Sequence, residues 1–276
     1  MKKTLKALFT CSLFAVAAIG VWQYYETLPI RGSYETGPIN YPIIDKASLK
    51  AQLSSCSRQE LEDMRLAGLE AIKWQGLLGK VDSNVISDII RNYDEFYIGD
   101  RYPYDESVDE DTQSSYFYHS HRPKEHGHFH IYFSDEEIMD QYKPIATWDR
   151  KNRNTHIVAI SMHPDGEPIG LFVPNQWITK DQWYEAEDMM KMIDFFEINN
   201  PYPSWPSNQW VNQVLKLFKP QIKEALQIRD HFIESYNEPI EELVKNKKID
   251  AISSIALSIP DQMNVIEELL NEQPGN

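Results

Sequence analysis

The chain has 276 residues, of which 42% are hydrophobic and 12% aromatic, so it can build a real core and is not intrinsically disordered. Its formal net charge of −15 repels phosphate backbones, and nucleic acid is not expected as a partner. Its two cysteines are Cys11 and Cys56. Because the first falls in a targeting segment, no internal disulfide is expected, and a Cys-x-x-Cys zinc site is excluded.

The N-terminus has the pattern of a targeting segment. Lys2, Lys3 and Lys6 precede an apolar stretch over residues 7–22, which is the arrangement of a secretory signal peptide. The bulky aromatic residues at the end of this stretch also suit an uncleaved membrane anchor. We therefore predict a signal peptide or membrane anchor over residues 1–25. The protein is expected to be exported, either to the periplasm or anchored in the inner membrane and facing the periplasm.

The rest of the chain is expected to contain a linker and one domain. Residues 26–50 include three prolines and are predicted to form an extended linker. A single domain follows over residues 51–272. Within it, Ser57 and Glu60 form a capping box that begins a helix, and a second helix is expected from about residue 82.

The middle of the chain predicts two β-hairpins. The polar, acidic segment 99–115 is expected to be a surface loop that leads into the first hairpin, over residues 116–133. The second hairpin pairs residues 155–162 with residues 168–173 across a Pro-Asp-Gly turn.

Helices are expected after the second hairpin. Thr179 is predicted to cap a helix that reaches Glu197, two helices flank Pro220, and a last helix spans residues 261–270. The predicted fold class is therefore α+β. It consists of a small antiparallel sheet of about four strands in two hairpins, packed by helices on the N-terminal and C-terminal sides.

Most of the eight histidines lie in one short window of the first hairpin, at alternating positions. Alternating residues of a strand point to the same face. If the hairpin closes symmetrically on the turn at residues 122–125, His119 lies opposite His128 and Phe117 lies opposite His130. All five imidazoles of the window then lie on one face, and aromatic residues bury the other. The five are His119, His121, His126, His128 and His130.

Histidines on neighbouring strands can bind one transition metal. Cross-strand neighbours lie about 5 Å apart, whereas His126 and His130 are about 13 Å apart along the strand and cannot easily bind the same ion. We expect His119, His126 and His128, or His121 in place of His126, to bind zinc or another transition metal. Three histidines with an open fourth position are typical of catalytic rather than structural zinc sites.

Two further residues are expected to transfer protons, namely Glu125 and His130. Glu125 points away from the histidines in a regular strand, but it can turn back where the hairpin turn begins. The predicted function is metal-assisted hydrolysis of a small molecule. A non-catalytic metal-binding or small-ligand-binding protein, and an interaction domain whose histidines have no chemistry, remain open alternatives. His156, His163 and His231 receive no role.

The run His-Gly-His-Phe-His-Ile-Tyr over residues 126–132 resembles the histidine-triad hydrolase signature, in which alternating histidines are followed by apolar residues. That resemblance implies a phosphoester hydrolase whose nucleophile is the middle histidine, His128. The first apolar position holds glycine here, which departs from the signature.

Five segments carry a longer resemblance. They include Glu-His-Gly-His-Phe-His over residues 125–130. In combination they are similar to a bacterial family of unknown function, domain of unknown function 6969. The resemblance would cover residues 50–270 and implies one domain with both hairpins and the C-terminal helices, but no activity. The segments are residues 116–122, 125–130, 157–162, 175–179 and 203–206.

Overall fold

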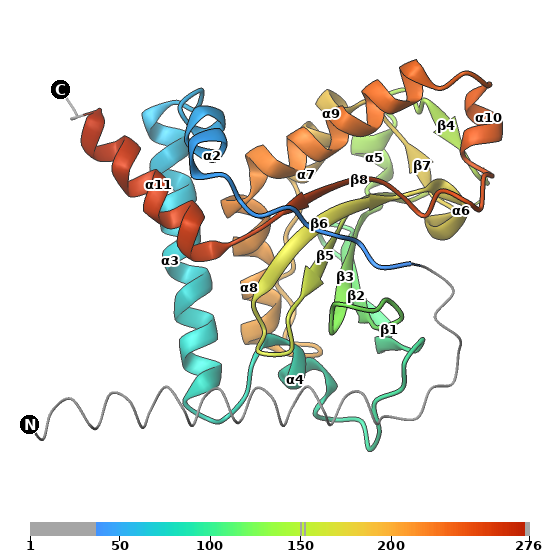
Figure 1. The fold of residues 1–276 in the computed structure, drawn as a ribbon. Helices are drawn as coiled ribbons and strands as arrows, with labels where there is room; N and C mark the ends of the chain where they lie inside the picture. Colours follow the sequence, from blue (N-terminus) through green and yellow to red (C-terminus); the bar gives the residue numbers. More distant parts are fainter. Residues whose placement is uncertain (1–36, 150, 152, 274–276) are drawn as a thin grey trace, which may run out of the picture.

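The computed structural model describes residues 37–149, 151 and 153–273 (Figure 1). At its centre is a six-stranded sheet in the order β1-β2-β3-β5-β6-β8, and every neighbouring pair is antiparallel. The strands are β1 (Arg101–Asp109), β2 (Ser114–His119), β3 (Gly127–Phe133), β5 (Thr155–Met162), β6 (Pro168–Pro174) and β8 (Ala251–Ala256). A second, small sheet pairs β4 (Ala146–Thr147) with β7 (Gln182–Trp183).

Helices precede, interrupt and follow the strands. Two long ones, α3 and α8, pack against each other. In order, the helices are α2 (Lys46–Leu53), α3 (Arg58–Gly79), α4 (Val85–Ile90), α5 (Glu136–Met139), α6 (Gln176–Thr179), α7 (Ala186–Ile193), α8 (Trp205–Leu217), α9 (Lys219–Ser235), α10 (Ile240–Leu243) and α11 (Ile259–Glu272).

The predicted antiparallel α+β class is confirmed, but the main sheet has six strands rather than about four. Both additional strands are edges of the sheet. Strand β1 lies inside the segment 99–115, which was predicted to be a loop because it is polar and contains a proline at position 103. Charged residues and prolines are tolerated at sheet edges, because one side of an edge strand needs no hydrogen-bonded partner.

The helix predictions were correct at the start of the domain and wrong in one later segment. The capping box of Ser57 and Glu60 begins α3, and α8 and α9 flank Pro220. The helix predicted over residues 179–197 is reduced to α7. The reason is Asp181, whose carboxylate accepts hydrogen bonds from the Thr179 hydroxyl at 2.7 Å and from the backbone N–H of His156 at 2.7 Å. These bonds hold this segment beside the sheet.

The predicted signal peptide or anchor over residues 1–25 lies outside the described residues. Of the predicted linker 26–50, residues 37–45 contain neither helix nor strand, but α2 begins within it, at Lys46. In the described part of the chain, no helix combines the length and the apolar character needed to cross a membrane.

The two faces of the main sheet differ. Register places the side chains of Tyr116, Tyr118, Phe129 and Ile131 on one face, the core face, where all four are buried. Helix α8 packs there, and the ring centroid of its Trp210 lies 5.8 Å from that of Phe129. The predicted aromatic face of the first hairpin is therefore confirmed.

The opposite face, here called the histidine face, is crossed by the segment of residues 37–45, the N-terminal strap. Figure 1 shows the strap in blue, passing in front of β6 and β5. The ring of Tyr41 lies against Gly170 of β6, and its hydroxyl is 2.7 Å from the Ser161 hydroxyl of β5. An extended segment therefore crosses the face that carries the histidines and contacts it through Tyr41.

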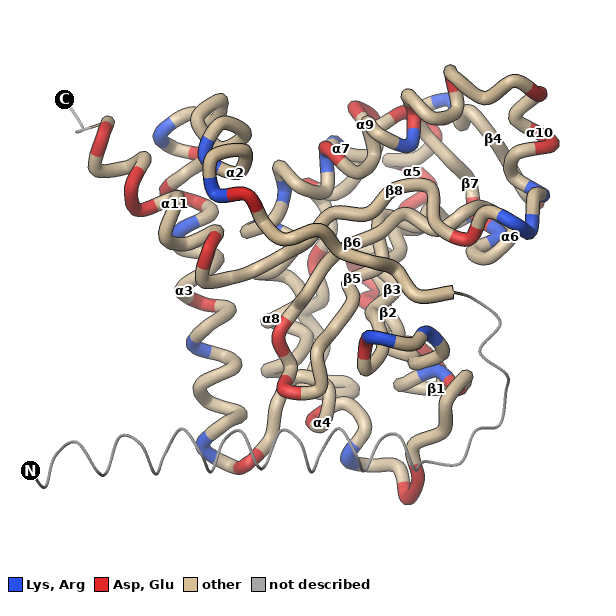
Figure 2. The backbone as a smooth tube through the Cα atoms, in the orientation of Figure 1, with Lys and Arg blue, Asp and Glu red and all other residues tan. Residues whose placement is uncertain are grey.

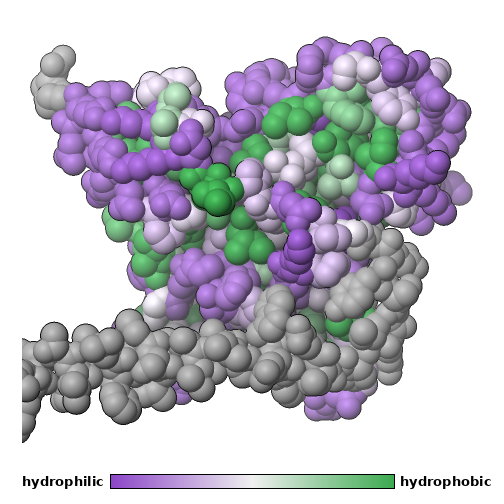
Figure 3. Space-filling model, viewed as in Figure 1, coloured by the Kyte–Doolittle hydropathy of each residue, from purple (hydrophilic) through white to green (hydrophobic). Residues whose placement is uncertain are grey.

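The outer surface agrees with the composition. Figure 2 shows acidic and basic residues mixed along α3 and α9, whereas the charged residues of α11 are all acidic. Figure 3 shows mainly hydrophilic residues over α2, α9 and α10, with hydrophobic patches towards the middle of this view. In this view, charged residues are thus distributed over the described helices rather than gathered in one basic patch.

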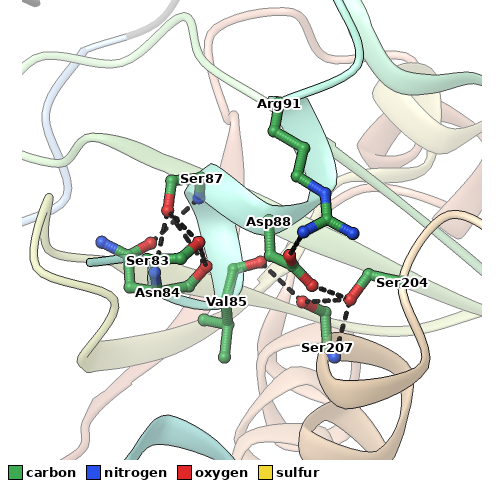
Figure 4. Close-up of polar contacts among 8 residues, drawn as sticks. All are labelled: Ser83, Asn84, Val85, Ser87, Asp88, Arg91, Ser204 and Ser207. Carbon is green, nitrogen blue, oxygen red and sulfur yellow. Dashed lines mark hydrogen bonds and ion pairs between the residues drawn. The ribbon is translucent and has the colours of Figure 1, made fainter. Parts of the chain in front are cut away.

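A buried polar cluster joins α4 to α8 (Figure 4). The Asp88 carboxylate accepts a hydrogen bond from the Ser204 hydroxyl and pairs with Arg91 at 2.9 Å. The Ser204 hydroxyl caps α8 by accepting the backbone N–H of Ser207 at 3.2 Å. The Ser207 hydroxyl in turn donates to the carbonyl of Val85 at 3.0 Å. The start of α8 is thus bonded to Val85, the first residue of α4, and to Asp88 in the same helix.

Ser204→Ala is expected to lower the free energy of unfolding by about 2 kcal/mol. The change removes the N-cap of α8 and one partner of a buried carboxylate. Urea unfolding of the two proteins measures the effect. The control is Ser235→Ala at the exposed end of α9, which should change stability by less than about 0.5 kcal/mol. Equal stabilities of the two variants would contradict the role assigned to Ser204.

Candidate metal centre

The first hairpin forms with the predicted register. His119 lies opposite His128, and Phe117 lies opposite His130. On the next strand, Ser161 of β5 lies opposite His128. Residues directly opposite one another share a face, so these side chains all point to the histidine face.

Three imidazoles on this face point their Nε2 atoms at one another. The separations are 2.8 Å between His119 and His128, 3.1 Å between His128 and His130, and 3.0 Å between His130 and His119. Among the described residues, these three form the group whose ligand atoms all lie within 4.8 Å of one another. We call this group the histidine trio. It offers three nitrogen ligands to one ion, and its residues come from two adjacent strands.

The outer nitrogens of two of these rings have specific partners. Nδ1 of His128 lies 2.6 Å from a carboxylate oxygen of Glu125. Nδ1 of His130 lies 2.7 Å from Nε2 of His156. A carboxylate that accepts the Nδ1 proton fixes the tautomer in which Nε2 carries the lone pair. Glu125 thus turns back towards the histidines, as the sequence analysis allowed.

The trio is held in its neutral form. Burial lowers the pKa of His119, His128 and His130 well below the usual value, and the neighbouring histidines lower it further. Burial also raises the pKa of Glu125 to about 7, although a hydrogen bond from Ser161 opposes that rise. Near neutral pH none of the three rings therefore carries a second proton, so each can offer one nitrogen lone pair.

His121 lies beside the trio but is not part of it. Its ring centroid is 4.6 Å from that of His119 and 5.0 Å from that of His128. Burial lowers the pKa of His121 to about 4. This residue lies on the predicted face, next to the two histidines with which it was expected to bind a metal.

His126 does not lie on the histidine face, so the expectation that all five imidazoles lie together is corrected. Strand β3 begins one residue later, at Gly127, and alternation does not govern a residue outside the strand. The ring of His126 instead stacks on Phe96 at 5.5 Å, and its Nδ1 is hydrogen-bonded to the Tyr118 hydroxyl. A Cβ at position 127 would lie 2.6 Å from that hydroxyl, so glycine gives Tyr118 the room to reach His126.

His130 and His156 occupy positions that sequence reasoning did not give them. His130 was expected outside the metal ligands, as a proton-transfer group, but it completes the trio. His156 received no role, yet it contacts His130 from β5. Its burial is complete enough to lower its pKa to about 3. The sequence did contain a signal for His130. This residue lies two positions after His128 in the same strand, so its side chain points to the same face.

The fold and the site define an α+β protein whose antiparallel sheet carries a largely buried histidine trio on the face that the strap crosses. The family model described as "Domain of unknown function (DUF6969)" matches residues 65–257. Because this is more than half of the chain, the protein belongs to that family, and the predicted resemblance is confirmed. Searches of the curated proteins and of the solved structures return no match. The matched range includes all eight histidines.

Proposed function

We propose that His119, His128 and His130 bind one divalent transition-metal ion, such as zinc, in a site that catalyses hydrolysis. The observation that carries the proposal is the convergence of three buried Nε2 atoms within 3.1 Å of one another. The lowered pKa values keep the three rings neutral. Neutral imidazoles that point Nε2 lone pairs at one another repel. A metal cation removes this repulsion.

The separations within the trio support a site with an open side. For a metal–nitrogen distance of about 2.05 Å, ligands at right angles are about 2.9 Å apart, and tetrahedral ligands are about 3.4 Å apart. The observed Nε2–Nε2 separations of 2.8, 3.0 and 3.1 Å are close to the separation for ligands at right angles. The three nitrogens would therefore cover one side of the ion. Bound there, the ion would lower the pKa of a water molecule on the other side and make it a nucleophile near neutral pH.

The surrounding residues would take supporting roles. Glu125 would orient His128 and raise the basicity of its Nε2, and His156 would do the same for His130. His121 lies next to the trio, where its neutral ring could accept a proton from the nucleophile. The proposal places this chemistry outside the cytoplasm, as the targeting pattern of residues 1–25 predicts.

A non-catalytic metal-binding role is the second candidate. It is supported by the burial of His128 and His130, which leaves little of the trio exposed. A histidine-triad phosphoester hydrolase is less well supported. Its nucleophile would be His128, but this ring is fully buried, with Nδ1 on Glu125 and Nε2 facing two other imidazoles.

Metal binding is tested by titrating metal-free protein with zinc. One equivalent is expected to bind, and Glu125→Gln is expected to weaken the affinity about 10- to 100-fold, because an amide orients His128 less well than a carboxylate does. His231→Ala is the matched control, since its side chain is exposed and lies outside the site. Wild-type protein that binds no zinc would contradict the proposal.

Catalysis is tested with the same zinc-loaded protein and an activated ester, p-nitrophenyl acetate. Hydrolysis that depends on zinc and is lost in His128→Ala would support the enzyme. One bound equivalent of zinc without hydrolysis of this ester or of bis(p-nitrophenyl) phosphate would favour the non-catalytic role.

A further inference from the structure

We propose that Tyr41 of the N-terminal strap is a positioning residue of the histidine site. It would act through Ser161 and Glu125 on His128, and so set how firmly the trio holds its metal. This inference rests on the proposed metal site. It also deepens that proposal, because it assigns a part of the site to a segment that lies outside the matched family range 65–257.

The first observation is a continuous series of polar contacts. The Tyr41 hydroxyl lies 2.7 Å from the Ser161 hydroxyl, and Glu125 lies 2.6 Å from Nδ1 of His128. Between them, the Ser161 side chain is near enough to the Glu125 carboxyl to lower its pKa through a hydrogen bond. Ser161 is fully buried, so its hydroxyl does not face bulk solvent. The strap is thus connected to a ring nitrogen of the trio through Ser161 and Glu125.

The second observation is that these bonds fit only one direction of donation when Nε2 of His128 carries a lone pair and Glu125 is ionised. His128 then donates from Nδ1 to Glu125. A carboxylate only accepts, so Ser161 must donate to Glu125. The oxygen of Ser161 is left as an acceptor, and the donor it receives is the Tyr41 hydroxyl. Burial raises the pKa of Tyr41 above its ordinary value, so its proton is retained.

The third observation is that the sheet provides room for Tyr41. A Cβ at Gly170 would lie 2.1 Å from a ring carbon of Tyr41, so no larger residue fits beneath this ring. Two further contacts hold the strap on the hairpin turn. The Lys124 ammonium donates to the side-chain oxygen of Asn40 at 2.8 Å, and Arg122 donates to the carbonyl of Gly37 at 3.2 Å.

The test compares Tyr41→Phe with wild type in the full chain. Phenylalanine keeps the ring over Gly170 and removes only the hydroxyl. In metal-free protein, the NMR signal of the Nδ1 proton of His128 is expected to shift upfield, because its bond to Glu125 weakens. The affinity for Co²⁺ is expected to fall about 3- to 10-fold, which is less than the effect of changing Glu125 itself.

Ser161→Ala should reproduce both changes, and the double variant should add little to either single change, because the two hydroxyls act in one series. Tyr142→Phe is the matched control, since it removes a phenol hydroxyl from a half-buried ring elsewhere. An unchanged His128 signal in Tyr41→Phe would overturn the inference, whatever the metal affinity. Wild-type protein that binds no Co²⁺ would contradict the proposed function, while the NMR signal would still decide the role of Tyr41.

Discussion

Replacing His130 by alanine is expected to lower the affinity for zinc at least about 100-fold, whereas replacing His126 should change it less than about threefold. His130 supplies one of three convergent nitrogens, and a two-histidine site loses a full metal–ligand bond. His126 lies on the core face, bonded to Tyr118. Affinities are measured by competition with a chromogenic chelator at pH 7.

The two variants distinguish the structure from the arrangement predicted by alternation alone. The sequence pattern placed His126 among the ligands and His130 outside them, so it predicts the opposite order of affinities. His126→Ala also removes a buried ring, and its fold is checked by circular dichroism before titration. A large loss of affinity in folded His126→Ala, with little loss in His130→Ala, would contradict the trio.

Metal-free protein is expected to lose stability steeply as the pH falls below about 6.5. Six histidines, four of them buried and two half-buried, have a pKa lowered by loss of solvent, to about 3 for His156 and about 4 for His121 and His126. Above pH 6.5 these rings are neutral in both states, and their contribution is fully present. Below pH 6.5, these histidines become protonated in the unfolded chain but stay neutral in the folded chain. The free energy of unfolding therefore falls until the pH reaches the pKa values of the folded state.

Two buried carboxyls act in the opposite direction. Burial raises the pKa of Glu125 to about 7 and that of Asp181 to about 6, so the folded state binds their protons more readily than the unfolded state does. Near pH 5.5, the unfolded chain binds about six more protons on the histidines and about two fewer on the carboxyls than the folded chain does. The unfolded chain therefore binds about four more protons in total. The expected slope near pH 5.5 is about 5 kcal/mol per pH unit, which exceeds the total stability of many domains within two or three units.

The measurement is urea unfolding between pH 7.5 and 5 in the presence of a chelator. His121→Gln should reduce the slope by about one proton, because it removes one titrating imidazole. The ring is half-buried, so its loss leaves no large cavity. His231→Ala should leave the slope unchanged, since its side chain is exposed. A free energy of unfolding that is flat between pH 7 and 5 would contradict the neutral, buried state of the cluster.

The central hairpins could be predicted from the sequence because their signals are local. Alternation and the turn at residues 122–125 fixed the pairing of His119 with His128, and the Pro-Asp-Gly turn fixed the second hairpin. Strands β1 and β8 were not predicted. An edge strand needs pairing on one side only, so its sequence can remain polar and irregular.

His156 shows why the rest of the site could not be predicted. A register shift between β3 and β5 places Tyr132 opposite His156, although His130 lies opposite Ala159. Positions 156 and 159 are three apart and would point to opposite faces in a regular strand. The bulge inserts one residue and returns His156 to the histidine face. No pattern in the residues 155–162 indicates that shift.

The sequence by itself determined the location of the site, a histidine-rich hairpin with one polar face and one aromatic face, because the two-residue period of a strand acts locally. The tertiary structure decided which histidines meet. It removed His126, added His130 and His156, and brought Tyr41 across the sheet to Ser161. These choices depend on where strands begin, how neighbouring strands are bulged and which distant segment covers the face, and such contacts between remote residues leave no periodic pattern in the chain.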